Sequence, residues 1–408
     1  MIIGRIALLF HRNCVTLHPL SYGKNRRAGI PGHGTTEAGS GAFPMPSPVE
    51  GNDERKRSGD TFFGKQPFRQ AGSSFSLKAQ DRLYGREVQG RKAATRRRDG
   101  RAEGGHWTGR SMWKSWNMPE HKSGQKIMKK GLVLEGGAMR GLFSAGVMDV
   151  LMENGIAPDG VIGVSAGAAF GCNMKSRQPG RVLRYNQKLA HDWRYASLRS
   201  LLTTGDYFGG EYAYHYVPRH VDYFDVDAFR ENPMEFWAVC TNVGTGKAEY
   251  RQLKEVDDEC LEYIRASASM PIAARIVTVD GRKLLDGGIA DSIPLRFFQG
   301  QGYARNLVVL TQPEGFVKTP NPLMPLMRIW LRRHPRIVRA LEQRHVMYNA
   351  ELDYVREEEK KPNTLVLRPK GKLAIGHISH DPAEMQATYD QGRETALENL
   401  EKIKELFA

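Results

Sequence analysis

The sequence predicts an α/β fold with a mainly parallel central sheet, and the pattern of residues 131–164 is the main reason. An uninterrupted apolar run at residues 131–134 leads into a glycine turn, a helical pattern follows, and a second apolar run covers residues 160–164. Uninterrupted apolar runs are typical of strands covered on both faces. A strand, a helix and a second strand in this order form a crossover unit, so the two strands are expected to be parallel.

The helix of this unit is predicted from its spacing. Apolar residues recur every three or four positions from Leu142 to Leu151, which gives a helix one buried face. Asn154 and Gly155 follow, and glycine takes the left-handed conformation that ends many helices. The helix is therefore expected to end there.

Later segments are expected to extend the sheet and to cover it. Further strands are predicted over residues 235–242, 306–311 and 364–369. A polar-aromatic helix is expected between Arg181 and Leu202. Asp381, Pro382 and Glu384 form a helix-start signal, so a last helix is predicted from there to the C-terminus.

The positive charge of the chain is concentrated in its first third. The 408 residues include 60 Lys and Arg against 45 Asp and Glu, a net charge of +15. Residues 1–127 hold 23 of these basic residues and 10 of the acidic ones, so residues 128–408 are nearly neutral. We predict a main domain over residues 128–312 and an accessory region over residues 313–408, made of helices and a strand, packed on it.

Residues 1–127 are predicted to form a disordered tail. Their composition of Gly, Ser, Arg and Pro buries too little apolar surface to offset the entropy of the chain. The Arg-rich stretch at residues 90–98 leaves binding of nucleic acid or acidic lipid open, but nucleic acid is not the expected partner. Met128-Lys129-Lys130 directly precedes the first strand, so the alternative is an over-extended reading frame.

Several classes of protein are excluded by simple counts. No run approaches the roughly 18 apolar residues of a membrane span, and the N-terminus makes a poor secretory signal. The four cysteines lie far apart without a CxxC pair, which suggests neither a disulfide framework nor a zinc site. A cytoplasmic protein without metal or cofactor is expected.

A candidate nucleophile follows the second predicted strand. Gly163-Val164-Ser165-Ala166-Gly167 is a G-x-S-x-G pattern, in which a sharp turn between strand and helix presents the serine hydroxyl above the sheet. The pattern is weak alone, because a plain turn between strand and helix also uses small residues.

The glycine turn after the first strand is a candidate anion site. Backbone N–H groups at a helix start favour negative charge, and glycine lets a ligand approach closely. Gly136, Gly137 and Ala138 could therefore hold an oxyanion, with Arg140 steadying the turn. Because Ala138 has a Cβ, we expect it to keep an ordinary negative φ. The alternative is a purely structural turn.

A serine nucleophile needs a base, and Asp286 is the candidate. It follows the predicted strand end Leu284-Leu285 and precedes Gly287-Gly288. None of the seven histidines after Ser165 has such a glycine-framed strand-end position. An Asp-Gly-Gly sequence is by itself usually only a tight turn.

Taken together, these motifs resemble the signature blocks of patatin-like phospholipases in order and spacing. The blocks are Glu135 to Gly141, the G-x-S-x-G around Ser165, an Ala-Ser-x-x-x-Pro at residues 266–271, and Asp286-Gly287-Gly288. The resemblance covers roughly residues 129–309 and is closest to bacterial members. It departs from the family pattern in two places, with Glu135 for the usual Asp and Ala138 for the usual third glycine.

The resemblance implies a three-layer α/β/α sandwich and a Ser–Asp dyad. Ser165 would be the nucleophile and Asp286 the base. The oxyanion hole would consist of Gly136, Gly137, Ala138 and Arg140, and the supporting glycines would be Gly141, Gly163, Gly167, Gly287 and Gly288. The implied activity is that of a serine lipid acyl hydrolase, either a phospholipase A or a general carboxylesterase. A Ser–Asp–His esterase of α/β-hydrolase type and a non-catalytic lipid-binding protein remain alternatives.

Residues 325–333 mix apolar side chains with arginines. The favoured interpretation is a helix packed on the core with its arginines in water. The alternative is a lid or a membrane contact, which would place the cytoplasmic protein at the inner membrane surface.

Overall fold

A computed structural model describes residues 128–408 of the protein, and the predictions for residues 1–127 lie outside this range. The centre is an eight-stranded sheet, formed by β1 (Lys129–Leu134), β2 (Gly160–Val164), β3 (Glu235–Asn242), β4 (Ala248–Leu253), β5 (Val277–Val279), β6 (Arg282–Asp286), β7 (Tyr303–Val309) and β8 (Thr364–Leu367). The strand order is β5-β6-β3-β2-β1-β7-β8, and β4 pairs with β3. Five neighbouring strands, β3, β2, β1, β7 and β8, are parallel to one another, whereas β4 and β6 run antiparallel to β3. The predicted parallel pairing of β1 and β2 is confirmed.

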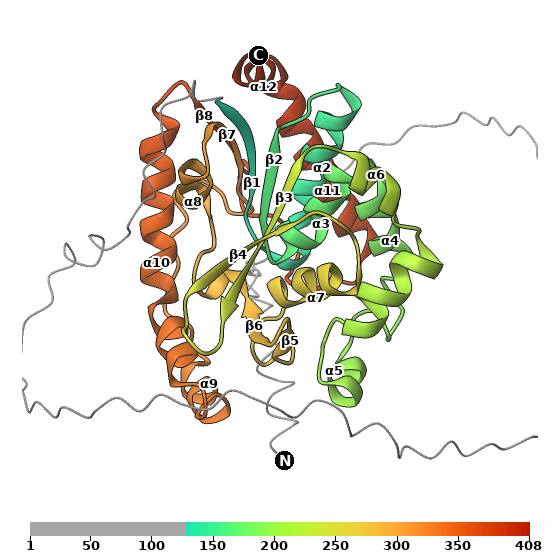
Figure 1. The fold of residues 1–408 in the computed structure, drawn as a ribbon, viewed down its shortest axis with the longest axis vertical. Helices are drawn as coiled ribbons and strands as arrows, with labels where there is room; N and C mark the ends of the chain where they lie inside the picture. The colour runs from blue at the N-terminus through green and yellow to red at the C-terminus, as the bar shows by residue number, and fades with distance from the viewer. Residues whose placement is uncertain (1–127) are drawn as a thin grey trace, which may run out of the picture. The chain divides into compact units, whose positions relative to one another are not determined.

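The two faces of the sheet are covered by separate hydrophobic cores. Along β1, Leu132 and Leu134 point into one core, whereas Val133 points into the other. All three side chains are completely buried, because helices lie on both faces (Figure 1). This arrangement confirms the predicted three-layer α/β/α sandwich.

The larger core lies under helices from both halves of the described chain: α2 (Gly141–Glu153), α3 (Ala166–Lys175), α4 (Arg181–Lys188), α6 (Val226–Glu231), α7 (Asp258–Ser267), α11 (Pro382–Glu398) and α12 (Leu400–Phe407). The opposite face is covered mainly by α8 (Leu295–Gly300) and α10 (Pro335–Glu359). The remaining elements are η1 (Ala138–Arg140), α5 (Leu198–Thr204), η2 (Tyr212–Val221), η3 (Gly287–Ile289) and α9 (Met324–Trp330).

The C-terminal region is built into the sandwich. Strand β8 pairs with β7 and extends the sheet. Helix α11 packs closely against α2 at two glycines. A Cβ on Gly146 would lie only 2.1 Å from the Tyr389 carbonyl oxygen, and a Cβ on Gly392 would lie only 2.0 Å from the Phe143 carbonyl oxygen, so neither position has room for a side chain. The Tyr389 hydroxyl also donates a hydrogen bond of 2.6 Å to Asp149.

The prediction of a single helix between Arg181 and Leu202 is wrong. Two helices, α4 and α5, occupy this stretch, separated by residues 189–197. Ser197 explains the second start, because its hydroxyl accepts a hydrogen bond of 2.9 Å from the backbone N–H of Ser200 and so caps α5. The helix-end prediction at Gly155 is confirmed, since this residue has φ of 66°.

None of the helices in residues 128–408 combines the length and the apolar content that a bilayer-spanning helix needs.

Candidate active site

Ser165 lies at the sharp turn between β2 and α3. Its backbone is strained, with φ of 55° and ψ of −119°, a conformation that bulky residues rarely adopt. The turn requires the flanking glycines, because a side chain at either position would clash with the backbone. A Cβ on Gly163 would lie 2.2 Å from the Gly167 carbonyl oxygen, and a Cβ on Gly167 would lie 2.4 Å from the Leu134 carbonyl oxygen. The start of α3 lies directly behind the serine.

The sheet brings Asp286 next to this turn. Strand β2 ends with Val164 opposite Val239 of β3, and Asp286 of β6 lies opposite the next residue of β3, Cys240. The side chains of Ser165 and Asp286 line the same cavity, and Ser165 lies close enough to lower the pKa of the Asp286 carboxyl. The two residues are 121 positions apart in the sequence, so the register of β3 is what brings them together.

Burial shapes the chemistry of Asp286. The side chain is almost inaccessible, and this burial raises the pKa of the carboxyl above its ordinary value. The charge of Arg344, the Ser165 side chain and the hydrogen bond from the Gly288 N–H oppose the rise. The Gly288 N–H donates to the carboxylate over 2.8 Å, so the Gly287-Gly288 turn also fixes the rotamer.

The Ala-Ser-x-x-x-Pro block holds both residues by their backbones. The Ser165 N–H donates to the Ser267 hydroxyl over 3.0 Å, and this hydroxyl donates to the Val239 carbonyl over 2.6 Å. The Asp286 N–H donates to the carbonyl of Ser269 over 2.9 Å. The end of α7 is therefore a common support for the candidate nucleophile and the candidate base.

The glycine turn lies against Ser165. A Cβ on Gly136 would come within 2.9 Å of the Ser165 Cβ, so only glycine fits beside the hydroxyl. Within residues 128–408, the backbone N–H groups of Gly137 and Ala138 donate to no protein acceptor. They are therefore available to a ligand at this turn.

The expectation of a negative φ at Ala138 is wrong, because its φ is 50°. The turn is held in this shape by two backbone hydrogen bonds, from Arg140 to the Gly137 carbonyl and from Met139 to the His377 carbonyl. A left-handed conformation costs a residue with a Cβ about 1–2 kcal/mol. The surrounding contacts must offset this strain.

Glu135, which replaces the usual aspartate, ties the turn to two later segments. Its buried carboxylate accepts hydrogen bonds of 2.6 Å from the Thr311 N–H, beyond β7, and from the Tyr348 hydroxyl on α10. Arg140 makes a different contact, a hydrogen bond of 2.5 Å from its Nη1 to Nε2 of His377. Burial, together with the charges of Arg140 and its neighbours, lowers the pKa of His377 to about 4. The ring is therefore neutral near pH 7, and its Nε2 accepts the hydrogen bond.

Two cavities that differ in polarity meet at Ser165. One, of about 130 Å³, is lined mainly by aromatic and aliphatic side chains, including Phe170 and Tyr185, and is called the apolar cavity. The other, of about 280 Å³, also has apolar walls but contains Asp286, Arg140 and the glycine turn, and is called the polar cavity. An ester with its carbonyl at Ser165 would have an apolar space on one side and a polar space on the other.

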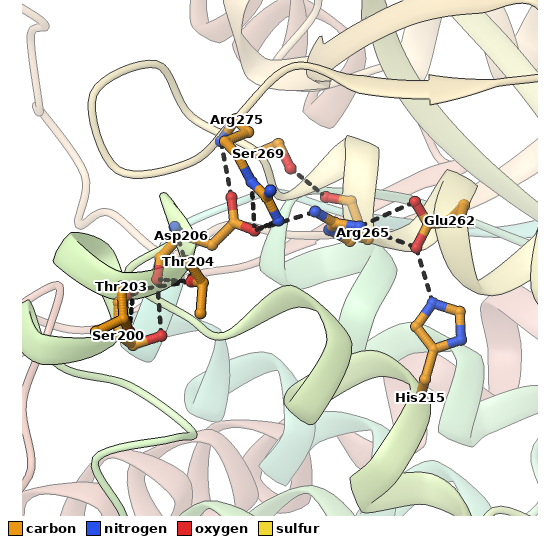
Figure 2. A network of polar contacts seen from close by, with 9 residues as sticks. All are labelled: Ser200, Thr203, Thr204, Asp206, His215, Glu262, Arg265, Ser269 and Arg275. Carbon is orange, nitrogen blue, oxygen red and sulfur yellow. Dashed lines mark hydrogen bonds and ion pairs between the residues drawn. The ribbon is translucent and has the colours of Figure 1, made fainter. Parts of the chain in front are cut away.

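An ionic network around the buried carboxylate of Asp206 supports the wall of the polar cavity (Figure 2). The Asp206 carboxylate accepts hydrogen bonds of 3.0 Å each from the guanidinium groups of Arg265 and Arg275. Arg265 also binds Glu262, which in turn contacts His215 over 2.8 Å. Arg265 lies on α7, so the network fixes the helix that supports Ser165 and Asp286.

Sequence reasoning located Ser165, Asp286 and the glycine turn, and the structure brings these segments together. It missed the contributions of the C-terminal region to the polar cavity, which are Lys318, Arg344, Tyr348, His377 and Ile378. These residues follow no recognisable motif and lie more than 150 positions after Ser165. No local signal in the sequence could have found them.

Comparison with known proteins identifies the fold family. Residues 132–298 match the sequence model of the family described as patatin-like phospholipase. This segment, less than half of the chain, is similar to the patatin-like phospholipase family. This patatin-like domain indicates a lipid ester hydrolase. Residues 334–408 match a second family, described as a domain of unknown function (DUF6363).

Relatives of the patatin-like domain occur in a bacterium and in fungi. The uncharacterised protein YjjU of Escherichia coli is 28% identical over 292 residues, which cover 64% of this chain and 74% of YjjU. Lysophospholipase NTE1 of Coccidioides immitis is 24% identical over 307 residues, or 70% of this chain. The alignment covers only 18% of that fungal protein, so the similarity supports the patatin-like family without restricting it to bacteria. VipD from Legionella pneumophila, a solved structure, has 13% identity and a TM-score of 0.36 over 67% of each chain, a likeness too low to carry a conclusion.

Proposed function

We propose that the protein is a serine lipid acyl hydrolase that works through a Ser165–Asp286 dyad. The observation that carries this proposal is that Ser165 lies where an apolar cavity meets a more polar one, and that Asp286 lines the polar cavity beside it. The apolar cavity suits an acyl chain and the polar cavity suits the alcohol part of an ester. The relatives named lysophospholipase support a lipid ester as the substrate.

The proposed reaction has two halves. The Ser165 hydroxyl attacks the ester carbonyl carbon while its proton moves to the Asp286 carboxylate. The N–H groups of Gly137 and Ala138 stabilise the resulting oxyanion. The ester C–O bond then breaks, and the leaving alkoxide takes the proton from Asp286. Water attacks the acyl-enzyme with Asp286 as base, and the fatty acid leaves as Ser165 regains its proton.

The raised pKa of Asp286 favours this role. A carboxylate with an ordinary pKa of about 4 is a weak base for a hydroxyl group. Burial makes the carboxylate more basic, which brings its pKa closer to the working pH of a cytoplasmic enzyme. Burial also strengthens the hydrogen bond to Ser165 on which the proposed mechanism depends, because the surrounding dielectric is low.

A Ser–Asp–His mechanism is the second candidate, since His377 lines the same cavity as Ser165. Its Nε2 is bound to Arg140, and its low pKa makes the ring a weak base. The dyad therefore explains the geometry better. The third candidate, a lipid-binding protein without activity, predicts no ester turnover.

The decisive experiment combines covalent labelling with product analysis. Full-length protein treated with an alkyl fluorophosphonate is expected to gain one adduct, which peptide mapping locates at Ser165. The untreated protein is expected to release fatty acid from a lysophospholipid, and the labelled protein is expected to release none. Turnover without labelling at Ser165, or labelling at another serine, would contradict the proposal.

We further propose that α9 contacts the surface of a lipid aggregate from the cytoplasmic side. Met327 and Leu331 pack into the protein, but Ile329 and Trp330 are 68% and 55% exposed. Exposed arginines at 332 and 333 follow directly. Apolar side chains flanked by cations are typical of interfacial helices.

Charge reversal tests this contact. Arg332→Glu with Arg333→Glu is expected to reduce sedimentation with vesicles that contain anionic phospholipid, because each cation near such a surface contributes about 1 kcal/mol. Lys402→Glu is a suitable control, since this exposed residue lies on α12, at the other end of the molecule from α9 (Figure 1). Arg328 is left unchanged because it pairs with Glu342. Unchanged vesicle binding in the double variant would exclude the contact.

A further inference from the structure

We propose that the C-terminal region gives the patatin-like domain a phosphate-binding subsite. In this subsite Lys318 and Arg344, together with Arg140, hold the phosphate of a lipid head group beside Ser165. The inference rests on the proposed hydrolase function and specifies its substrate class as anionic, phosphate-bearing lipid esters. It also gives a role to the segment that matches a domain of unknown function.

The three cations reach one cavity from three segments. Arg140 belongs to η1, Lys318 follows β7, and Arg344 lies on α10. All three line the polar cavity that contains Ser165 and Asp286. Lys318 and Arg344 lie beyond the residues that match the patatin-like family, so the family motif does not account for them.

The direct contacts of these cations are with uncharged groups. Nε of Arg344 donates to the Gly288 carbonyl over 2.6 Å, and Nζ of Lys318 lies 4.5 Å from the centre of the Tyr348 ring. Arg140 binds the neutral His377, and its buried Nε has no hydrogen-bond partner in residues 128–408.

Among the described residues, the partly buried Arg140, Lys318 and Arg344 have no carboxylate within ion-pair distance. In contrast, Arg181 and Arg265 are paired with Asp222 and Asp206. Withdrawing a cation from water without such a partner costs free energy. The gathering of the three cations at a cavity is therefore best explained by an anionic ligand.

The three carboxylates of the cavity have other partners. Glu135 accepts hydrogen bonds from the Thr311 N–H and the Tyr348 hydroxyl, and Asp286 accepts one from the Gly288 N–H. Asp206 is paired with two other arginines of the network in Figure 2. The pKa of Lys318 reports the net effect of these charges. Burial, followed by the charge of Arg344, lowers this pKa to about 8, even though the carboxylates of Glu135 and Asp286 act to raise it.

The three cations lie where the head-group phosphate of a bound lipid is expected. A glycerophospholipid ester has an acyl chain on one side of its carbonyl and a phosphorylated alcohol on the other. With the acyl chain in the apolar cavity, the alcohol and its phosphate occupy the polar one. Two guanidinium forks and an ammonium group approaching from three segments suit an anion with several oxygens.

The test compares two substrates that differ only in the phosphate. These are 1-oleoyl-lysophosphatidate and 1-oleoylglycerol, presented in the same non-ionic mixed micelles. Arg344→Gln and Lys318→Gln are each expected to lower the ratio of kcat/KM for the phosphorylated over the neutral substrate about 10- to 100-fold, the usual loss for a hydrogen bond to a charged group. Arg339→Gln, at an exposed position of the same helix, is expected to leave the ratio unchanged.

Each other outcome has a definite meaning. Equal loss on both substrates would assign Arg344 and Lys318 to positioning of Asp286 and overturn the subsite. A wild-type protein without preference for lysophosphatidate, but with 1-oleoylglycerol hydrolysis altered by inorganic phosphate, would show a free-phosphate site and overturn the head-group assignment. Failure to hydrolyse either ester would contradict the hydrolase function itself. Thermal melting of both variants near the wild-type temperature confirms that the comparison concerns folded protein.

Discussion

Ser165→Ala is expected to lower kcat for a lysophospholipid by about 10⁴-fold or more, and Asp286→Asn by about 10²- to 10⁴-fold. The first change removes the oxygen that forms the acyl-enzyme in the proposed mechanism. The second keeps the shape of the side chain, and its Oδ1 can still accept from the Gly288 N–H, but it removes the proposed proton acceptor. Both rates are measured as fatty acid release under saturating substrate.

The pH dependence of the wild-type enzyme follows from the raised pKa of Asp286. In the proposed mechanism Asp286 must be ionised to act as the base, so kcat/KM is expected to fall as the pH decreases through this raised pKa. The acidic limb should therefore lie above the ordinary carboxyl value of about 4. Asp286→Asn is expected to remove this limb from whatever activity remains.

The contribution of Asp286 to stability is expected to decrease with rising pH, whereas its contribution to activity increases. Because the pKa of Asp286 is higher in the folded than in the unfolded chain, its contribution to stability is present at low pH and lost as the pH rises through the folded value. Asparagine cannot ionise, so Asp286→Asn should be at least as stable as the wild type at pH 7. A variant that is both inactive and less stable would point to misfolding.

Asp149→Asn is the matched control for this pair of effects. Asp149 is also a buried carboxyl whose pKa is raised by burial, but it lies on α2 and lines neither cavity. The kcat of the Asp149→Asn variant is expected to stay within a few fold of the wild-type value. Full activity of Asp286→Asn would refute the dyad and return attention to His377.

Asp206→Ala is expected to cause the largest loss of stability, about 3–5 kcal/mol in the free energy of unfolding. The Asp206 side chain is only 2% exposed and pairs with Arg265 and Arg275. Its removal leaves the guanidinium of Arg265, which is 14% exposed, with one carboxylate fewer inside the protein. Urea denaturation followed by circular dichroism measures the change.

A surface pair provides the comparison for this prediction. Asp353 contacts Arg356 over 2.7 Å, but its side chain is 73% exposed. Such pairs contribute little, so Asp353→Ala is expected to unfold at nearly the wild-type urea concentration. If Asp206→Ala behaved in the same way, the network of Figure 2 would have no role in holding α7.

The parts of the protein that sequence predicts well are those specified by neighbouring residues. β1, the glycine turn, α2 and the turn at Ser165 depend on apolar spacing and on glycines within a few positions. Asp286 was found because a glycine turn follows a strand end. The strain at Ala138 was missed, since its positive φ is imposed by a hydrogen bond between Met139 and the distant His377.

The remaining features depend on which segments meet in space. The split between α4 and α5 follows from a single cap at Ser197 inside a stretch of helical composition. Arg344 and Lys318 reach the cavity only because α10 and the loop after β7 fold across it. Ser267 was visible as part of a motif, but its hydrogen bond to the Ser165 N–H requires the position of α7 to be known.

The strand order has a practical consequence for anyone who dissects this protein. β7 pairs directly with β1 in the middle of the sheet, and β8 pairs with β7, yet the patatin-like match ends at residue 298, before both strands. A fragment cut at that limit would leave the apolar β1 as an open edge, available for pairing with other chains. The boundary of the recognisable family is therefore not the boundary of the folding unit, and an expression fragment should extend through α12.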